Sequence, residues 1–256
     1  MNNASIVYNT GSFLWKRKKY PSAASQYERA FTRAELLVIL AVLALLALVV
    51  LPALANNRPR SARVICANNL RQISMGFQLW GNDRGDQPPW EVPVAQGGTM
   101  IHPLAPNTWL HFAWVSNELS TPKILLCPSD SGQPARDFTG SPDGGYLHPN
   151  FANRATSYLL SHGNTTRVSP ADIFLADRNM GFDSSGGCAR FSTVRIVNSR
   201  PPSPNYGWDT NLHRSSGNII RLDGRVDQVS NTALREAALA QLPTDGASSF
   251  HMVAPR

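Results

Sequence analysis

The sequence has few of the patterns that mark an enzyme or a nucleic-acid-binding protein. It contains neither a G-x-S-x-G nor an H-E-x-x-H motif, and no paired carboxylates of the kind that hydrolytic sites use. Beyond residue 30 it has one lysine, Lys123, and its basic residues form no stripe that would follow a phosphate backbone. Its three cysteines include no C-x-x-C pair and no histidine at a fixed offset, which argues against a zinc site. We therefore expect no enzymatic activity and no nucleic acid as a partner.

Charge is also missing from one long stretch. No charged residue occurs between Glu35 and Arg58, and the 20 residues from Leu36 to Ala55 are apolar, with one proline, Pro52. About 20 apolar residues at ~1.5 Å each span a ~30 Å hydrocarbon core. A buried core helix seldom needs so long an unbroken run. The run is therefore expected to enter a membrane.

The distribution of charge predicts the orientation of this run. Residues 1–30 carry five basic residues against one acid, Glu28, a net charge of +4 out of the total of +7. Basic residues on the N-terminal side keep that side in the cytoplasm. The part of the chain after Asn56 is then exported.

Two kinds of export signal fit this run. A cleaved secretory signal would end at the A-x-A site of residues 53–55. However, 35 residues precede the run, and the run is longer than the ~7–15 apolar residues usual in such signals. In the second reading, cleavage falls before the run, which remains in the protein as an anchor.

Residues 30–35, AFTRAE, followed by LLVIL, resemble the N-terminal signal of type IV prepilins and type II secretion pseudopilins. In that family a prepilin peptidase cuts before the Phe and N-methylates it. Counting Phe31 as the first mature residue, Glu35 and Pro52 fall at the fifth and twenty-second positions, where the family has a Glu and often a Pro. The chain departs from the family at Ala30, which replaces the usual Gly. The resemblance implies cleavage between Ala30 and Phe31 and a proline kink in the anchor at Pro52.

The resemblance also implies partners for the N-terminal helix. By itself, Glu35 is a negative charge at a helix N-terminus, where the helix dipole favours it by ~0.3–1 kcal/mol. In the family this Glu meets the N-terminal amine of an adjacent subunit. The expected partners are therefore the lipid bilayer, prepilin peptidase and other pilin-like subunits, with the chain anchored once in a bacterial inner membrane.

The helical pattern continues beyond the apolar run. Apolar residues recur at spacings of four, three, four and three: Cys66, Leu70, Ile73, Phe77 and Trp80. This pattern predicts an amphipathic helix with one buried stripe that ends near Gly81-Asn82. Pro59 is expected to break or kink the helix between its two halves.

Three short motifs resemble those of a group of prepilin-like proteins: C-x-x-NLRQ at Cys66, C-P-S-D at 127–130, and H-x9-DG from His213 to Gly224. Cysteines in an exported domain can oxidise. Because Cys66 and Cys127 both belong to these motifs, the resemblance favours a disulfide between them and leaves Cys188 over. Alternatively, Cys66 is simply a small apolar residue of the stripe.

The rest of the chain reads as short strands in a loop-rich body. Runs of branched and large apolar residues predict strands at 123–127, 157–161, 172–177, 192–197 and 218–222. Asp223-Gly224 predicts a two-residue type I′ hairpin turn, and residues 230–242 a closing helix capped by Ser230 or Asn231.

The expected fold is therefore α+β and pilin-like, with a mainly antiparallel, loop-rich sheet. Its segments are a leader (1–30), a transmembrane anchor (31–56), an amphipathic helix that continues the anchor (57–82) and an exported globular domain (83–256).

Candidate sites in the exported domain are weak. His213 and Asp223 can be drawn as a base and its orienting group, but Asp223 is better explained as a turn residue, and His213 as a hydrogen-bonding residue at the hairpin base. Aspartates in Gly/Ser-rich loops could hold Ca²⁺, although their spacing is not that of an EF-hand. They are Asp130, Asp137, Asp143 and Asp183.

The leading functional hypothesis is a non-enzymatic, membrane-anchored pilin-like subunit. The alternative is an exported binding domain, for example for polysaccharide, that uses the prepilin signal only as an anchor. Tryptophans could supply its stacking surface, or they could close the core: Trp80, Trp90, Trp109, Trp114 and Trp208. A hydrolase that uses His213 is a third hypothesis.

Overall fold

The structure is a computed structural model that describes residues 32–161, 169–181, 184–188, 191–197, 206–242 and 250–255. The chain divides into two compact units, Met1–Val50 and Leu51–Arg256. One long helix, α1 (Arg33–Asn82), contributes residues to both. The expected cleavage site between Ala30 and Phe31 lies outside the described residues, as does Asp183.

The first part of α1 is apolar and exposed. Residues Arg33–Leu51 form a helix that is long and apolar enough to cross a membrane, and none of it is buried by the rest of the chain. Leu48 and Val49, for example, are each 72% exposed. Apolar surface in water costs about 25 cal/mol per Å², so a helix of this kind is stable only in an apolar environment. A membrane anchor and a signal sequence both meet this description.

The helix α1 runs through both of its prolines. Pro52 and Pro59 lie within the continuous span Arg33–Asn82, so the helix does not break at Pro59. A kink at Pro59, the other alternative, and the kink expected at Pro52 stay predictions. A proline removes one backbone donor, and the turns on either side keep their own hydrogen bonds. The predicted end of the helix at Asn82 is confirmed.

Within the described part of the second unit, seven strands form one sheet in which every pairing is antiparallel. In order across the sheet they are β4 (Ser184–Cys188), β5 (Phe191–Val197), β9 (Phe250–Val253), β1 (Tyr158–Ser161), β2 (Ile173–Asp177), β7 (Ser216–Arg221) and β8 (Val226–Ser230). A separate pair joins β3 (Met180–Gly181) to β6 (Gly207–Trp208). The α+β class with a mainly antiparallel sheet is thus confirmed, and four of the five predicted strands are present.

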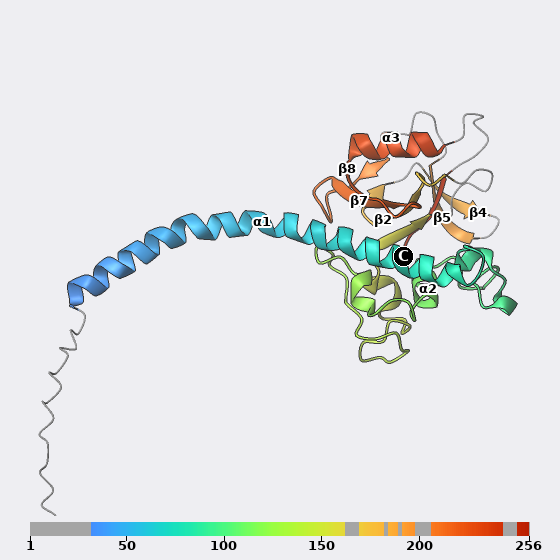
Figure 1. Ribbon diagram of the computed structural model, residues 1–256, viewed down its shortest axis with the longest axis horizontal. Coiled ribbons are helices and arrows are strands. Elements are labelled where there is room, and N and C mark those ends of the chain that lie inside the picture. The colour runs from blue at the N-terminus through green and yellow to red at the C-terminus, as the bar shows by residue number, and fades with distance from the viewer. Residues whose placement is uncertain are drawn as a thin grey trace, which may run out of the picture. The chain divides into compact units, whose positions relative to one another are not determined.

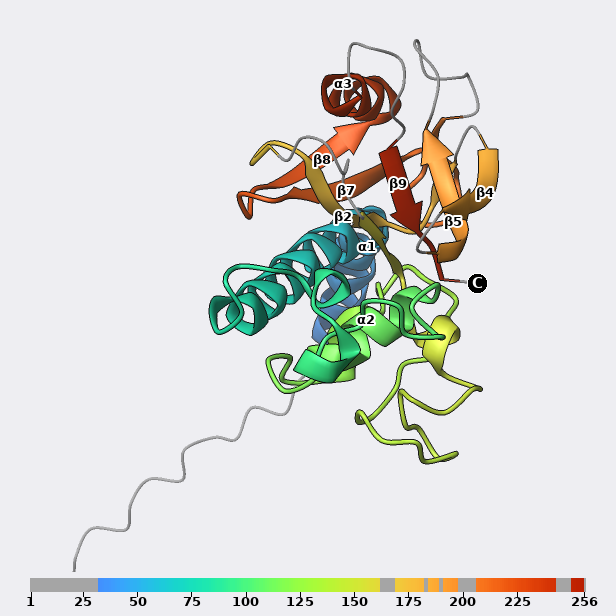
Figure 2. The same ribbon diagram turned by 90° about the vertical axis from the view of Figure 1, so that its right-hand side faces the viewer.

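Helices cover both faces of this sheet. Figures 1 and 2 show α3 (Asn231–Gln241) on one face and the later part of α1 on the other. On β1, Leu159 packs in the same cluster as Leu234 of α3, whereas its neighbour Leu160 packs with Leu70 of α1. Because successive strand residues point to opposite faces, every residue of β1 and β2 is buried.

An irregular segment, residues 83–155, packs on α1 as well. It contains α2 (Thr108–Trp114) and the 3-10 turns η1 (Pro89–Glu91), η2 (Val94–Gln96), η3 (Pro122–Leu125) and η4 (Ala152–Ala155). The predicted stripe of α1 is buried between this segment and the sheet: Cys66, Leu70, Ile73, Phe77 and Trp80 are each at most 4% exposed. The amphipathic interpretation of this half of α1 is therefore confirmed.

The strand predicted at 123–127 is wrong. Residues Pro122–Leu125 form the 3-10 turn η3, and the side chain of Thr121 accepts a hydrogen bond from the backbone of Lys123 at its start. A Thr-Pro pair is a helix-start signal, because the threonine caps a free N–H and the proline has none to satisfy. This local signal outweighs the short apolar run that follows it.

The hairpin at Asp223-Gly224 is present between β7 and β8, but the predicted type I′ turn is wrong. Gly224 has a φ of +81°, whereas Asp223 does not have a positive φ. The N–H of Gly224 donates to the carbonyl of Arg221 at 2.9 Å, which makes a three-residue loop with a bulge at the glycine. The N–H of Leu222 donates to Asp172 at 3.0 Å, so a neighbouring loop holds this turn in place.

The sequence predicted either Ser230 or Asn231 as the N-terminal cap of the closing helix α3. Ser230 precedes it in an extended conformation, and its side chain accepts a hydrogen bond from the backbone of Ala233. Ser230, and not Asn231, is therefore the cap.

Candidate functional site

The residues next to the expected cleavage site form a helix cap. The carboxylate of Glu35 accepts hydrogen bonds from the backbone N–H of Thr32 at 2.8 Å and from its hydroxyl at 2.9 Å. In return, the N–H of Glu35 donates to the hydroxyl of Thr32 at 3.2 Å. This reciprocal pair is a capping box, which satisfies N–H groups that have no partner inside the helix. Glu35 thus fixes the start of α1 at Arg33, directly after the cap Thr32.

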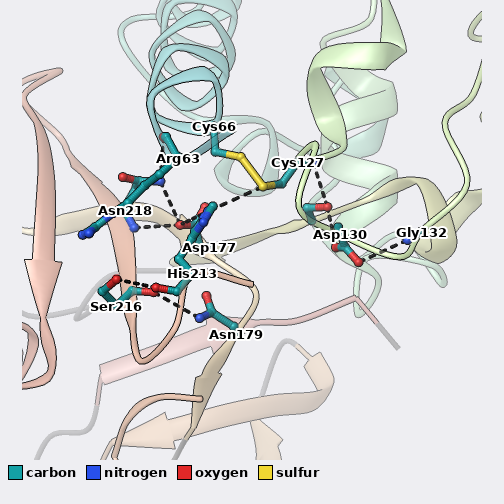
Figure 3. The surroundings of a disulfide bond; sticks show 11 residues. Arg63, Cys66, Cys127, Asp130, Gly132, Asp177, Asn179, His213, Ser216 and Asn218 are labelled. Atoms are coloured by element: carbon teal, nitrogen blue, oxygen red, sulfur yellow. Dashed lines mark hydrogen bonds and ion pairs between the residues drawn. A yellow bond between two sulfur atoms is a disulfide. The ribbon is translucent and has the colours of Figure 1, made fainter. Parts of the chain in front are cut away.

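The three sequence motifs of the second unit meet at one buried point. Cys66 of α1 is joined by a disulfide to Cys127 of the C-P-S-D motif, with 5.3 Å between the two Cα atoms. His213 of the H-x9-DG motif reaches the same disulfide, and its Nε2 lies 3.5 Å from Cys127 Sγ. Figure 3 shows His213 beside the disulfide. The pairing favoured by the motif resemblance is present in the structure, and the side chain of Cys188 lies outside what the structure describes.

A buried carboxylate completes this cluster. Asp177, the last residue of β2, is fully buried and accepts hydrogen bonds from the N–H of Asn218 at 2.7 Å and from its side-chain amide at 2.9 Å. Its Oδ2 lies 3.4 Å from His213 Nε2. Burial raises the pKa of Asp177 to about 7, although the hydrogen bonds from Asn218 act in the opposite direction.

Arg63 connects α1 to the same group of residues. Its guanidinium donates to the carbonyl of Gly217 at 3.1 Å, and its own carbonyl accepts from the side-chain amide of Asn218 at 3.4 Å. Its positive charge favours the ionised form of Asp177. Burial, and secondarily the charge of Arg63, lowers the pKa of His213 to about 4. The imidazole is therefore neutral at physiological pH.

The aspartates proposed as calcium ligands do not come together. Asp130 forms an ion pair with Arg178 and accepts a hydrogen bond from the hydroxyl of Ser157 at 2.6 Å. Asp137 and Asp143 lie in an exposed turn, where Asp137 accepts from Thr139. Among the described residues, the one group of side chains close enough to share a metal ion is Cys66, Cys127 and His213.

His213 and Asp223 have separate surroundings. The carboxylate of Asp223 accepts from the N–H of Arg225 at 2.9 Å within the hairpin turn. His213 instead faces the disulfide and Asp177, and its carbonyl accepts from the hydroxyl of Ser216 at 2.6 Å. The structure therefore supports neither a His213–Asp223 catalytic pair nor a bond from the His213 side chain across the hairpin base.

The tryptophans belong to the core of the second unit. Trp80, Trp90 and Trp208 are each at most 5% exposed, and Trp109 and Trp114 pack partly buried against the core. The three buried rings have no face open to an external sugar ring, whereas Trp109 and Trp114 keep part of their surface exposed. Most of the aromatic surface expected for the polysaccharide alternative is therefore used in the core.

Comparison with known proteins adds no relative. No family model matches the chain, and neither does any curated protein or solved structure. The functional conclusions below therefore depend on the residues and geometry of this chain.

Proposed function

We propose that this protein is a membrane-anchored, pilin-like structural subunit that prepilin peptidase processes between Ala30 and Phe31. The observation that carries this proposal is the helix α1. Its first part, Arg33–Leu51, is apolar and unburied, and its later part is the helix on which the α+β body packs. Such a chain combines a helix that fits a bilayer with a folded domain that would be exported.

The buried cluster supports a structural role for the exported body. Cys66, Cys127 and Asp177 are each fully buried, and His213 is 7% exposed. A substrate has no access to groups in this state, so they act on the fold. A disulfide also fits an exported domain, because thiols are oxidised outside the cytoplasm.

Processing is tested by the mature N-terminus. Co-expression of the full chain with a prepilin peptidase should yield a protein that begins with N-methylated Phe31, detected by mass spectrometry of the N-terminal peptide. Ala30→Leu should block cleavage, because a large side chain replaces the small residue at the cut. Ala23→Leu, within the leader but away from the cut, should be processed normally. A mature protein that begins at Asn56 would contradict the proposal and show that the apolar helix is a removed signal.

The role of Glu35 in association is tested by separating its charge from its cap. Glu35→Ala removes both, whereas Thr32→Ala removes the capping hydroxyl and keeps the charge. Loss of a cap costs about 1 kcal/mol of helix stability. If subunits associate through the charge, Glu35→Ala should abolish co-purification of two differently tagged copies from membranes, and Thr32→Ala should largely preserve it.

Both Thr32→Ala and Glu35→Ala should still be cleaved before Phe31. Unchanged co-purification in Glu35→Ala would favour the alternative, an exported binding domain that uses the helix only as an anchor.

A further inference from the structure

We infer that the reduced form of this protein binds one Zn²⁺-like divalent ion through Cys66, Cys127, His213 and Asp177, in the place that the disulfide occupies in the oxidised form. The inference concerns the exported body and does not depend on whether the chain assembles with other subunits. Sequence spacing argued against zinc because the ligands are far apart in the chain. Folding brings together donors from α1, the loop after η3, the loop before β7, and β2.

Two of the distances between donor atoms match those of a tetrahedral site. Zn–S bonds of ~2.3 Å and Zn–N or Zn–O bonds of ~2.0 Å place neighbouring ligand atoms ~3.3–3.8 Å apart. His213 Nε2 lies 3.5 Å from Cys127 Sγ and 3.4 Å from Asp177 Oδ2. The donor atoms of Cys66, Cys127 and His213 all lie within 4.8 Å of one another. To complete the site after the S–S bond is broken, the two sulfurs must separate from 2.14 Å to about 3.8 Å. Asp177, which lies outside the group within 4.8 Å, must also move toward the three other donors.

The donors also select the ion. Two thiolates and a neutral imidazole favour zinc-like ions over Ca²⁺ and Mg²⁺, which take oxygen ligands. Nε2 of His213 faces both Cys127 Sγ and Asp177 Oδ2, so it is the nitrogen that would bind the ion, with the ring proton on Nδ1. Asn218 donates two hydrogen bonds to Oδ2 of Asp177 and so fixes the position of this carboxylate, as the surrounding partners of metal ligands commonly do.

The charges balance when Arg63 is included. Two thiolates and one carboxylate carry three negative charges against the two positive charges of the ion. The remaining charge is offset by Arg63, which lies close enough to act on both Asp177 and His213. A buried metal site with nearly zero net charge avoids most of the cost of an unpaired buried charge.

The redox step determines which form exists. A dithiol reductant gives two electrons and two protons to the disulfide and becomes a cyclic disulfide itself. When the ion binds, the two thiol protons pass to the solvent, and neither the metal nor the sulfur changes oxidation state. A small-molecule disulfide oxidant accepts two electrons from the two thiolates and two protons from solvent, and becomes two thiols; the protein disulfide re-forms and the ion is released. The disulfide and the metal are therefore mutually exclusive.

The experiment uses the full chain in detergent, with Cys188→Ser to remove the third thiol. The protein is reduced with dithiothreitol in mild denaturant. Both reagents are then removed under anaerobic conditions, and the protein is titrated with Co²⁺. One equivalent should produce thiolate-to-cobalt charge transfer in the near ultraviolet and tetrahedral ligand-field bands in the visible, and Zn²⁺ should abolish both. The oxidised protein should give neither signal.

Variants locate the binding. His213→Gln should weaken Co²⁺ binding by about tenfold or more. His148→Gln, which changes a histidine outside the cluster, should leave binding unchanged. The inference is overturned if reduced protein gives no thiolate band, or if His213→Gln binds Co²⁺ as tightly as the unsubstituted chain.

A measurement of thermal unfolding tests the inference even if the reduced chain is poorly folded without metal. An ion that binds only the folded state raises the unfolding temperature of that state. Zn²⁺ should therefore raise the unfolding temperature of the reduced chain and leave that of the oxidised chain unchanged. No rise in the reduced chain would overturn the inference.

Discussion

Replacing both Cys66 and Cys127 with alanine is expected to lower the free energy of unfolding of the second unit, Leu51–Arg256, by about 4 kcal/mol. The two residues are 61 positions apart in the sequence, so their disulfide closes a long loop in the unfolded chain. Without it, the unfolded chain gains the conformational freedom that the loop had removed. Both side chains are fully buried, so the substitutions also remove packing around α1.

This loss is measured by urea unfolding of the protein in detergent, with the midpoint and slope analysed separately. For a body of about 200 residues, 4 kcal/mol corresponds to a fall in unfolding temperature of about 10 °C. Cys188→Ser is the matched control, and its unfolding midpoint should be unchanged. A double alanine variant within about 1 kcal/mol of the unsubstituted protein would show that the disulfide contributes little stability.

The parts of this fold that follow a local period could be predicted from the sequence. The stripe from Cys66 to Trp80 repeats with the helical period, and the strands at β1 and β2 are short apolar runs bounded by turn residues. Ser230 lies directly before a helical pattern, where it serves as a cap. The capping box at Thr32 was also readable, because Thr-x-x-Glu precedes an apolar run.

The buried cluster could not be predicted in the same way. Arg63, Asp177 and Asn218 are distant in sequence, and their contact follows from how α1 lies on the sheet. One signal was available: Asp177 is the charged end of an otherwise apolar strand, and a charge at that position needs partners. The motif resemblance indicated Cys66, Cys127 and His213, but it gave no reason to place His213 next to the other two.

His111 in α2 was not singled out by any pattern, yet it is fully buried. Its Nε2 lies 2.8 Å from the carbonyl of Ala105, which can only accept a hydrogen bond, so Nε2 carries the proton. Its Nδ1 lies 3.1 Å from the hydroxyl of Thr99 and accepts from it. Burial is the main cause that lowers the pKa of His111 to about 4, and the nearby His102 contributes in the same direction. The neutral ring is thus part of the native fold.

This burial makes the second unit sensitive to acid. In the unfolded chain the pKa of a histidine is about 6.5, so between pH 6.5 and about pH 4 the unfolded state binds a proton that the folded state does not. Stability from this residue is therefore fully present above pH 6.5 and is lost as the pH falls, at up to about 1.4 kcal/mol per pH unit. The total loss by pH 4 is about 3 kcal/mol.

The variant His111→Gln isolates this contribution. Glutamine can donate to the carbonyl of Ala105 but has no group that titrates, so at pH 7 the variant should be less stable by about 1–2 kcal/mol through lost packing and the lost bond to Thr99. As the pH falls to about 4, the unsubstituted protein loses its contribution from His111 and the variant does not. The two unfolding free energies should therefore converge or cross, measured by urea unfolding at several pH values. His148→Gln is the control and should keep a constant difference from the unsubstituted protein. A constant difference for His111→Gln as well would mean that His111 keeps an ordinary pKa in the fold.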